Sequence, residues 1–367
     1  PAPGRRRRGR TARQQGAAAE ALRGAAPISE PEFETDAFGR QRLRYQDDGW
    51  ETWTWAPEGV AAGPFECHYI AAGPANGPPL VLVHGFGASS YHWRYQLPEL
   101  AAQGYRVYAP CLLGYGWGPR TVLRYSGEVW AEQLNAFMCD VVRGPAVLAG
   151  NSVGAFASLL AAAFRPELCR GLVLLNAAGR FEERQPGAQP PRKQLGDLVA
   201  QAAEETEPGP LQWLLGQFQR AVATWAFVST KLRIQPILEW VYVNGNQVDD
   251  DLVKSIRTPA EHPDALDTFG QVIQAGRRTE GTVFEALDKL PRSVPLLLLW
   301  GMQDPWMRPE RARAILAECA ERDLECKFVE IDAGHCPQDD APDVVNAELA
   351  AWLADNGFAA TPAASVA

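Results

Sequence analysis

The sequence has no long hydrophobic run and no cysteine pattern typical of a cross-linked or metal-bound fold. Its apolar stretches, such as residues 294–300, fall far short of the roughly 20 apolar residues that a membrane-spanning helix needs. The seven cysteines include no C-x-x-C pair and are odd in number, which fits neither a disulfide framework nor a zinc site. We therefore expect no transmembrane segment and a reducing compartment, in which most of the free thiols pack as small core residues.

Acidic residues are nearly absent from residues 1–29. This stretch holds seven arginines and one glutamate, which gives it a charge of +6. Since the net charge of the whole chain is −9, the remaining residues carry −15. An acidic body argues against nucleic acid as the main partner, because phosphate contacts need basic surface. An arginine-rich, acid-poor leader is typical of organelle transit peptides, and a basic tail that binds RNA or lipid is the alternative. We predict a disordered leader over residues 1–45, with a transit peptide within residues 1–29.

Short apolar strands alternate with helical stretches in two separate parts of the chain. Strands are predicted at residues 65–70, 80–83, 105–110, 146–149, 172–175, 294–300 and 326–331. Helices are predicted at residues 97–102, 128–142, 152–164, 309–320 and 342–353. This alternation predicts an α/β fold with a mostly parallel sheet flanked by helices.

The alternation breaks off over residues 180–285, where long amphipathic stretches predict a helical cap inserted into one α/β domain. The core then comprises residues 46–179 and 286–358, and residues 359–367 form a disordered tail. Four aromatic residues of the insertion are candidates for an apolar substrate pocket, although packing of the cap on the core would use the same side chains. They are Trp213, Phe218, Trp225 and Phe227.

A serine nucleophile is indicated where the strand at residues 146–149 runs into a helix. The turn reads G-x-S-x-G, with Gly150, Ser152 and Gly154, which in strand–turn–helix context is a nucleophile elbow. The flanking glycines tolerate the strained turn, and the helix N-terminus favours an oxyanion near Ser152. A tight glycine-rich turn with an incidental serine is the alternative.

The loop H-G-F-G at residues 84–87 follows an earlier core strand. Such a loop supplies one oxyanion N–H, here that of Phe86, and the N–H of Val153 supplies the other. His84 lies on this loop, so we expect it to order the loop and not to act as a base.

The acid and base of a triad are expected at Asp304 and His335, which each follow a late core strand. The chain order Ser152, Asp304, His335 is that of α/β-hydrolases. The other position for a triad acid, after the strand at residues 172–175, holds the amide Asn176, which strengthens the assignment of Asp304. Cys336 is a rival nucleophile, but neighbouring side chains rarely point the same way.

Several of these stretches resemble plant and algal α/β-hydrolases, and they are most similar to the pheophytinase and chlorophyll dephytylase group. The stretches are L-V-H-G-F-G-A-S (82–89), Y-H-W-R (91–94), G-N-S (150–152), L-L-N-A-A-G (174–179), V-Y-V-N (241–244), D-P-W-M-R-P (304–309) and A-G-H-C-P (333–337). The resemblance runs over about residues 50–355. Cys111 stands where relatives usually have Asp, and Ala155 stands where they usually have Gly.

The resemblance implies a plastid serine hydrolase that removes the phytyl ester from chlorophyll or pheophytin, an apolar ester. It implies a chloroplast location, with mitochondrion or cytosol as alternatives, and leaves open a peripheral contact with the thylakoid membrane. The expected mechanism needs no metal and no organic cofactor. Serine also separates the chain from dehalogenases and epoxide hydrolases of this fold, which use a carboxylate there. A C–C bond hydrolase, a general carboxylesterase or lipase, and a non-enzymatic ligand receptor remain alternatives.

Overall fold

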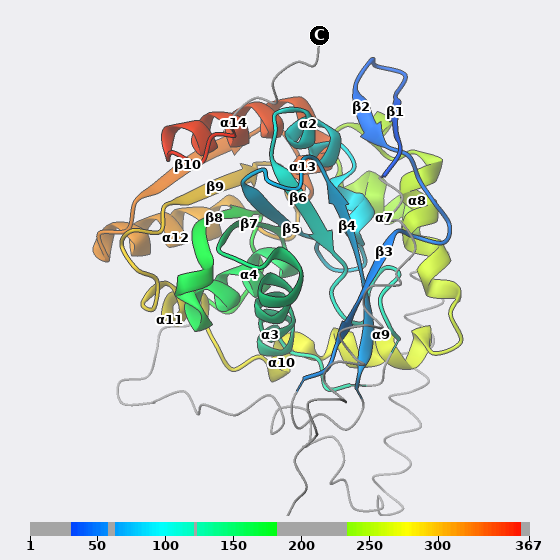
Figure 1. Ribbon diagram of the computed structural model, residues 1–367, viewed down its shortest axis with the longest axis horizontal. Helices are drawn as coiled ribbons and strands as arrows, with labels where there is room; N and C mark the ends of the chain where they lie inside the picture. Colours follow the sequence, from blue (N-terminus) through cyan, green and yellow to red (C-terminus); the bar gives the residue numbers. More distant parts are fainter. Residues whose placement is uncertain (1–30, 58–62, 121–122, 182–232, 361–367) are drawn as a thin grey trace, which may run out of the picture. The chain divides into compact units, whose positions relative to one another are not determined.

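The computed structural model describes residues 31–57, 63–120, 123–181 and 233–360. Their centre is an eight-stranded sheet with the order β10-β9-β8-β7-β5-β6-β4-β3 (Figure 1). The strands β5 to β10 run parallel to one another, whereas β3 and β4 form an antiparallel edge. Their bounds are β3 Glu51–Trp55, β4 Phe65–Ala72, β5 Pro79–Val83, β6 Arg106–Pro110, β7 Ala146–Asn151, β8 Cys169–Leu175, β9 Leu296–Gly301 and β10 Cys326–Ile331.

Helices cover both faces of this sheet and enclose two apolar cores. One face packs against α3 (Gly127–Phe137), α4 (Val153–Phe164), α11 (Val283–Leu287) and α12 (Pro309–Glu321). The other face packs against α2 (Gln96–Ala102) and α14 (Pro342–Asp355) (Figure 1). The central strands are rich in Leu and Val because both of their faces are buried. The predicted α/β fold with a mostly parallel sheet is confirmed.

The part of the predicted cap that the structure describes, residues 233–285, is helical. It contains α7 (Ile234–Val241), α8 (Asp250–Arg257), α9 (Ala265–Ile273) and α10 (Ala275–Arg278). The described chain also has short helical turns at η1 (Ser90–Trp93), η2 (Met138–Val142), η3 (Pro166–Leu168), η4 (Gly245–Gln247), η5 (Thr258–Glu261) and α13 (Pro337–Asp340). Residues 182–232 of the insertion, with all four aromatic candidates of the cap, lie outside the described residues.

The predicted disordered leader extends too far toward the core. Within its span, β1 (Phe33–Thr35) and β2 (Gln41–Leu43) form an antiparallel hairpin. Leu43 is fully buried, and its N–H donates to Arg94 O at 2.7 Å. Apolar burial and a main-chain bond therefore hold this segment on the domain, which the polar composition of the region did not suggest. The transit peptide predicted within residues 1–29 lies outside the described residues.

Two further differences concern element bounds. The strand β3 was not predicted, although Glu51–Trp55 alternates threonine and tryptophan in the pattern of an edge strand whose faces differ in exposure. The helix predicted over residues 128–142 is α-helical only to Phe137, because its last turn is a π-helix that ends at Arg143 in a left-handed conformation. Neither difference moves a candidate site residue.

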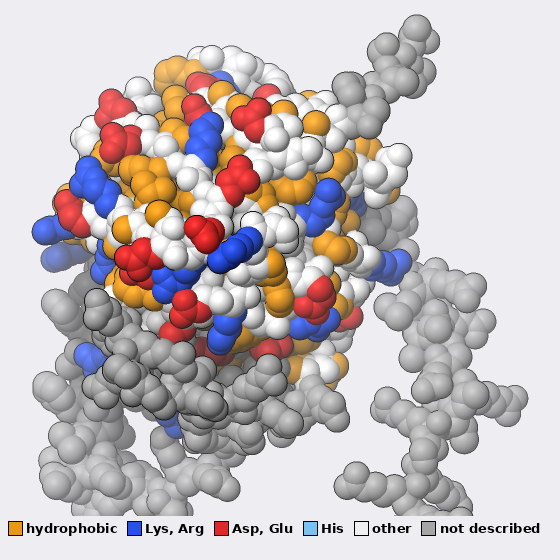
Figure 2. Space-filling view, turned by 90° about the vertical axis from the view of Figure 1, so that its left-hand side faces the viewer, with side chains coloured by type: hydrophobic (Ala, Val, Ile, Leu, Met, Phe, Trp, Pro, Cys, Tyr) orange, Lys and Arg blue, Asp and Glu red, His pale blue; other side chains and the backbone are white. Residues whose placement is uncertain are grey.

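Charge is mixed over the surface. On the face drawn in Figure 2, basic and acidic side chains are interspersed, with apolar side chains between them. Among the described helices, none combines the length and the apolar character needed to cross a bilayer.

Candidate active site

The turn after β7 has the backbone geometry of a nucleophile elbow. Ser152 adopts φ 56° and ψ −117°, a strained conformation that costs about 1–3 kcal/mol. The glycines on either side allow it, since a Cβ on Gly150 would lie 2.4 Å from Gly154 O and one on Gly154 would lie 2.3 Å from His84 O. The N–H of Ser152 donates to Leu175 O at 2.9 Å, which fixes the turn to the end of β8.

The structure brings Ser152, His335 and Asp304 into one hydrogen-bonded chain. His335 Nε2 lies 3.0 Å from Ser152 Oγ, and His335 Nδ1 lies 2.6 Å from Asp304 Oδ2. All three residues are about 95% buried or more. They come from the ends of β7, β9 and β10, which meet at the carboxyl edge of the sheet. The arrangement has the hydrogen-bond geometry that a Ser-His-Asp triad requires.

Asp304 is held as a carboxylate by several donors. Burial raises its pKa, but the hydrogen bond and charge of His335 and the N–H groups of Met307 and Trp306 lower it, and the pKa ends below its usual value. Asn176 Nδ2 also donates to Asp304 Oδ2 at 2.8 Å. A negative Asp304 favours the tautomer of His335 that carries its proton on Nδ1, and in that tautomer Nε2 is an acceptor facing Ser152 Oγ.

Asn176 thus has a part in the site that its amide did not suggest. Besides Asp304, its side chain pairs with Gly301, accepting from the N–H at 2.8 Å and donating to the carbonyl at 3.2 Å. It has a positive φ of 42° at the end of β8. A polar residue at the carboxyl end of a core strand was the available signal. Asn176 lies beside Asp304 and orients its carboxylate.

The cap holds the backbone on either side of His335. The N–H of His335 donates to Val241 O at 2.8 Å, at the end of α7. Asp340 accepts from Gly334 N at 2.7 Å and from Val243 N at 2.9 Å. A Cβ on Gly334 would lie 1.9 Å from Val241 O, so only glycine permits this approach. The bonds of His335 to Val241 and of Asp340 to Val243 join segments about 95 residues apart, so local sequence could not predict them.

A buried ionic network continues this contact between cap and core. Arg94 is fully buried, and its Nε donates to Asp339 Oδ1 at 2.7 Å. Its Nη1 donates to both carboxylate oxygens of Asp249 at 2.8 Å. The hydroxyl of Tyr242 donates to Asp339 Oδ2 at 2.9 Å and lies 2.7 Å from His92 Nε2. Each buried charge in this network has an opposite charge beside it.

The two oxyanion candidates lie on segments next to Ser152. Val153 is the first residue of α4, so its N–H has no partner within the helix. The loop that carries Phe86 lies directly against the serine, because a Cβ on Gly85 would be 3.1 Å from Ser152 Cβ. The ring of Phe86 is 43% exposed and contacts Tyr115 and Phe269. This placement is compatible with the expected pair of N–H donors.

His84 orders the loop, as expected. Its Nδ1 lies 2.8 Å from Gly85 O, and its Nε2 accepts from Leu112 N at 3.0 Å, so both ring nitrogens are used. Burial lowers the pKa of His84 to about 4 and those of His68 and His92 to about 3, which keeps all three neutral.

The cysteines near the site are structural. Cys336 Sγ faces Asn151 Oδ1 at 3.8 Å, and burial raises its pKa well above the usual value, which argues against a thiolate nucleophile. Cys111 is fully buried between His68 and Ser90. It therefore makes core contacts and no surface contact. Ala155 is fully buried in the first turn of α4.

An aromatic pair that the sequence did not single out borders the histidine. The ring of Trp306 lies 4.9 Å from that of His335, and the ring of Trp240 lies 5.8 Å from Trp306. Both tryptophans are partly exposed, at 39% and 61%. Trp306 belongs to the D-P-W stretch after β9, whose proximity to the triad acid was the available signal.

Known sequences agree with this architecture. Pheophytinase, a chloroplastic protein of Arabidopsis thaliana, is 29% identical over 336 residues, which cover 80% of this chain and 66% of that protein. A haloalkane dehalogenase of Mycobacterium marinum is 37% identical over 111 residues, which cover 30% of this chain and 37% of that protein. The chain therefore spans less than two thirds of the length of these relatives. The predicted resemblance to the pheophytinase group is confirmed.

Solved structures share the fold at low identity. A thermophilic esterase from Thermogutta terrifontis matches with a TM-score of 0.60 and 21% identity, covering 83% of this chain and 99% of that one. The enol-lactonase of Burkholderia xenovorans matches with a TM-score of 0.60 and 18% identity, covering 80% and 99%. The family profile of alpha/beta hydrolases matches residues 80–348. The chain accordingly belongs to the alpha/beta hydrolase family.

Proposed function

We propose that the protein is a serine hydrolase of carboxylic esters. The observation that carries this proposal is the hydrogen-bonded chain from Ser152 Oγ through His335 to Asp304, on a strained turn at a helix N-terminus. The N–H groups of Phe86 and Val153 are the proposed oxyanion donors, each worth roughly 3–4 kcal/mol to the transition state.

The proposed reaction has two halves. His335 Nε2 takes the proton of Ser152 as Oγ attacks the ester carbonyl, and it then protonates the leaving alcohol. The resulting acyl-enzyme is hydrolysed by a water that gives a proton to His335 and hydroxide to the acyl carbon, which releases the acid and restores Ser152. The lowered pKa of Asp304 supports this sequence, because a carboxylate stabilises the imidazolium in both halves.

The test compares the full chain with Ser152→Ala on p-nitrophenyl esters. We expect hydrolysis by the parent protein and a loss of kcat of at least about 10,000-fold in the variant. A matched Cys336→Ala variant removes the rival nucleophile and should keep most of the activity. Full activity in Ser152→Ala with an unchanged circular dichroism spectrum would overturn the proposal.

For the substrate, we propose a phytyl ester of a chlorophyll-type pigment. The support is the similarity to a protein named pheophytinase and the aromatic residues of the insertion and of the site. Incubation with chlorophyll a or pheophytin a, followed by chromatography for free phytol, tests it, with Ser152→Ala as control. Cleavage of p-nitrophenyl esters without any phytol would reject the pigment but keep the esterase, and cleavage of β-diketones alone would indicate a C–C bond hydrolase.

For the location, we propose the chloroplast. The support is the arginine-rich, acid-poor composition of residues 1–29 and the name of the chloroplastic relative. Residues 1–45 placed behind an initiator methionine and fused to a fluorescent protein should enter isolated chloroplasts. A fusion with the seven arginines of residues 1–29 replaced by glutamine is the matched control. Equal import of both fusions, or import of neither, would reject the proposal.

A further inference from the structure

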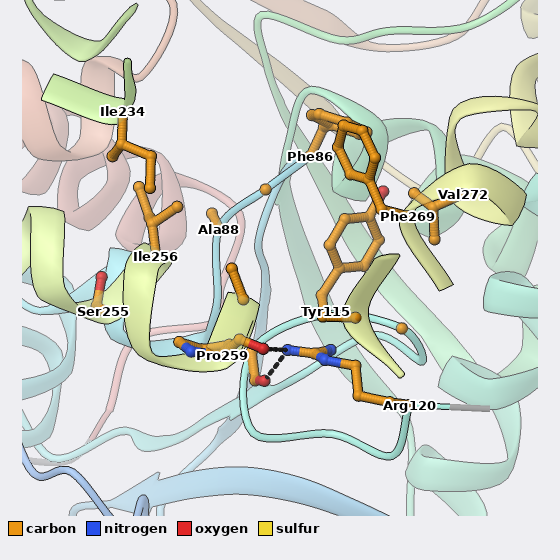
Figure 3. Close-up of a pocket in the computed structure, with 15 residues that line it drawn as sticks. Phe86, Ala88, Tyr115, Arg120, Ile234, Ser255, Ile256, Pro259, Phe269 and Val272 are labelled. Carbon is orange, nitrogen blue, oxygen red and sulfur yellow. Dashed lines mark hydrogen bonds between the residues drawn. The ribbon is translucent and has the colours of Figure 1, made fainter. Parts of the chain in front are cut away.

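A pocket opens beside the proposed oxyanion loop, between the core and the cap. Its volume is about 110 Å³. Figure 3 shows aromatic side chains on one side, aliphatic ones on the other, and Arg120 at one end. The apolar lining includes Phe86, Tyr115, Ile234, Ile256, Phe269 and Val272.

Among the described residues that line this pocket, Arg120 is the one with a charged side chain. Its Nη2 donates to the carbonyls of Gly116 at 2.5 Å and of Pro259 at 3.2 Å. Its Nη1 is buried and has no hydrogen-bond partner. Within the described residues, no carboxylate forms an ion pair with it. Two neutral carbonyls orient the guanidinium through Nη2, and the donors on Nη1 are unused.

Arg94 shows how the same fold treats an arginine that is fully buried. Both arginines lie between core and cap, but Arg94 is paired with the carboxylates of Asp339 and Asp249. Around Arg120, burial lowers the pKa, and only the weakly acidic groups of Cys111, Tyr125 and Tyr115 act against that effect. Arg120 is partly buried, so its charge without a counter-charge carries a desolvation cost that an anionic ligand would offset.

The pocket also lies close to the nucleophile. Phe86 and Gly87 line it, and Gly85, one residue earlier, is in contact with Ser152. A second unpartnered donor, the buried hydroxyl of Tyr115, belongs to the lining. A ligand in the pocket would therefore be next to an ester group bound at Ser152.

We propose that this pocket is a substrate subsite for a carboxylate at the end of an apolar chain, with Arg120 as its counter-ion. Among simple alkyl esters, the subsite then favours half-esters, in which a hydrocarbon segment joins the scissile ester to a free carboxylate. Guanidinium pairs with carboxylates through charge-assisted hydrogen bonds, and the apolar walls accommodate the hydrocarbon. The proposal rests on the proposed ester hydrolysis at Ser152 but does not require phytol as the leaving alcohol.

The binding experiment uses the full chain with Ser152→Ala, so that no probe is consumed. Calorimetry compares hexanoate with hexanamide, a neutral ligand of the same size. We expect hexanoate to bind roughly tenfold more tightly, and Arg120→Gln to abolish this preference. Arg257→Gln removes an exposed charge from α8 and should leave it intact. Equal affinity for both ligands, or an unchanged preference in Arg120→Gln, would overturn the subsite.

The kinetic experiment places the subsite relative to the nucleophile. The mono-p-nitrophenyl ester of suberic acid is compared with p-nitrophenyl octanoate, and we expect kcat/KM for the anionic ester to be roughly tenfold higher. Arg120→Gln should remove this ratio, whereas a loss of loop structure alone would lower both rates together. Hexanoate should compete with the anionic ester. Selective binding without competition would overturn the substrate role, and selective binding by a protein that hydrolyses no ester would reject the proposed function but not the anion pocket.

Discussion

The two sides of His335 are held by different kinds of interaction. On the sheet side, strand ends place Ser152 and Asp304, and the neutral amides of Asn176 and Asn151 complete the hydrogen bonds. On the cap side, carboxylates bind the backbone and the buried Arg94. The sheet side orients the reacting groups, and the cap side fixes where the histidine loop lies. Changes on the two sides should therefore separate catalysis from stability.

The largest effect is expected on the sheet side. Asp304→Asn keeps the shape of the side chain but removes the charge that fixes the Nδ1 proton of His335, so kcat should fall by about 10,000-fold. The thermal unfolding midpoint should change far less than in the cap-side variants, because both residues have the same size. Steady-state kinetics on a p-nitrophenyl ester and a thermal melt measure the two quantities. A small loss of kcat would mean that Asp304 is only a structural residue.

The opposite pattern is expected on the cap side. Asp339→Asn leaves Arg94 partly unpaired in a fully buried position, so the free energy of unfolding should fall by about 3–5 kcal/mol. The loss of kcat should be much smaller than in Asp304→Asn. Urea denaturation measures the stability. Replacing both partners, as Arg94→Met with Asp339→Leu, should recover part of it, and a double variant as unstable as the single one would contradict this explanation.

The difference between the two sides also decides what could be predicted from the sequence. The triad residues each follow a core strand, so local patterns placed Ser152, Asp304 and His335 at the same edge of the sheet. Arg94 and Asp339 are 245 positions apart, and Arg94 and Asp249 are 155 apart. Contacts between residues so far apart depend on the tertiary fold of the whole chain. No periodicity or short motif in the sequence predicts them.

The same reasoning explains the errors at the level of secondary structure. Buried central strands are continuous runs of Leu and Val, which the sequence displays directly. The hairpin of β1 and β2 is short and polar, and it is ordered by contacts with the core, among them the bond from Leu43 to Arg94. The sequence shows only that Asn176 is not an acid, since its bond to Asp304 forms across to the segment that follows β9.

A smaller effect on the sheet side concerns Asn176. Asn176→Gly removes the donor to Asp304 but keeps the left-handed backbone, so kcat should fall roughly tenfold through the poorer orientation of the carboxylate. Asn176→Ala should lose the same activity and a further 1 kcal/mol or so of stability from backbone strain. Kinetics and urea denaturation of the pair separate the two contributions. Equal stability of the Gly and Ala variants would contradict the strain argument.

On the cap side, buried His92 makes the free energy of unfolding depend on pH. Its pKa is about 3 in the folded protein and near 6.5 when unfolded, so the unfolded state binds the proton first as the pH falls. The stability from neutral His92 is complete above pH 6.5 and is lost toward pH 3, by about 1.4 kcal/mol per pH unit. His92→Gln should flatten the slope of unfolding free energy between pH 6 and 5, and His262→Gln, at an exposed position, should leave it unchanged.

The smallest effect is expected where a charge pair between core and cap is exposed to solvent. Lys254 Nζ lies 2.8 Å from Asp47 Oδ1, but the two side chains are 49% and 60% exposed. Water and salt screen such a pair, so Lys254→Ala should leave the unfolding midpoint and kcat unchanged within error. Arg94 and Lys254 both link core to cap, and only burial distinguishes them. A large, salt-dependent loss in Lys254→Ala would show that charge alone, and not buried charge, holds the cap against His335.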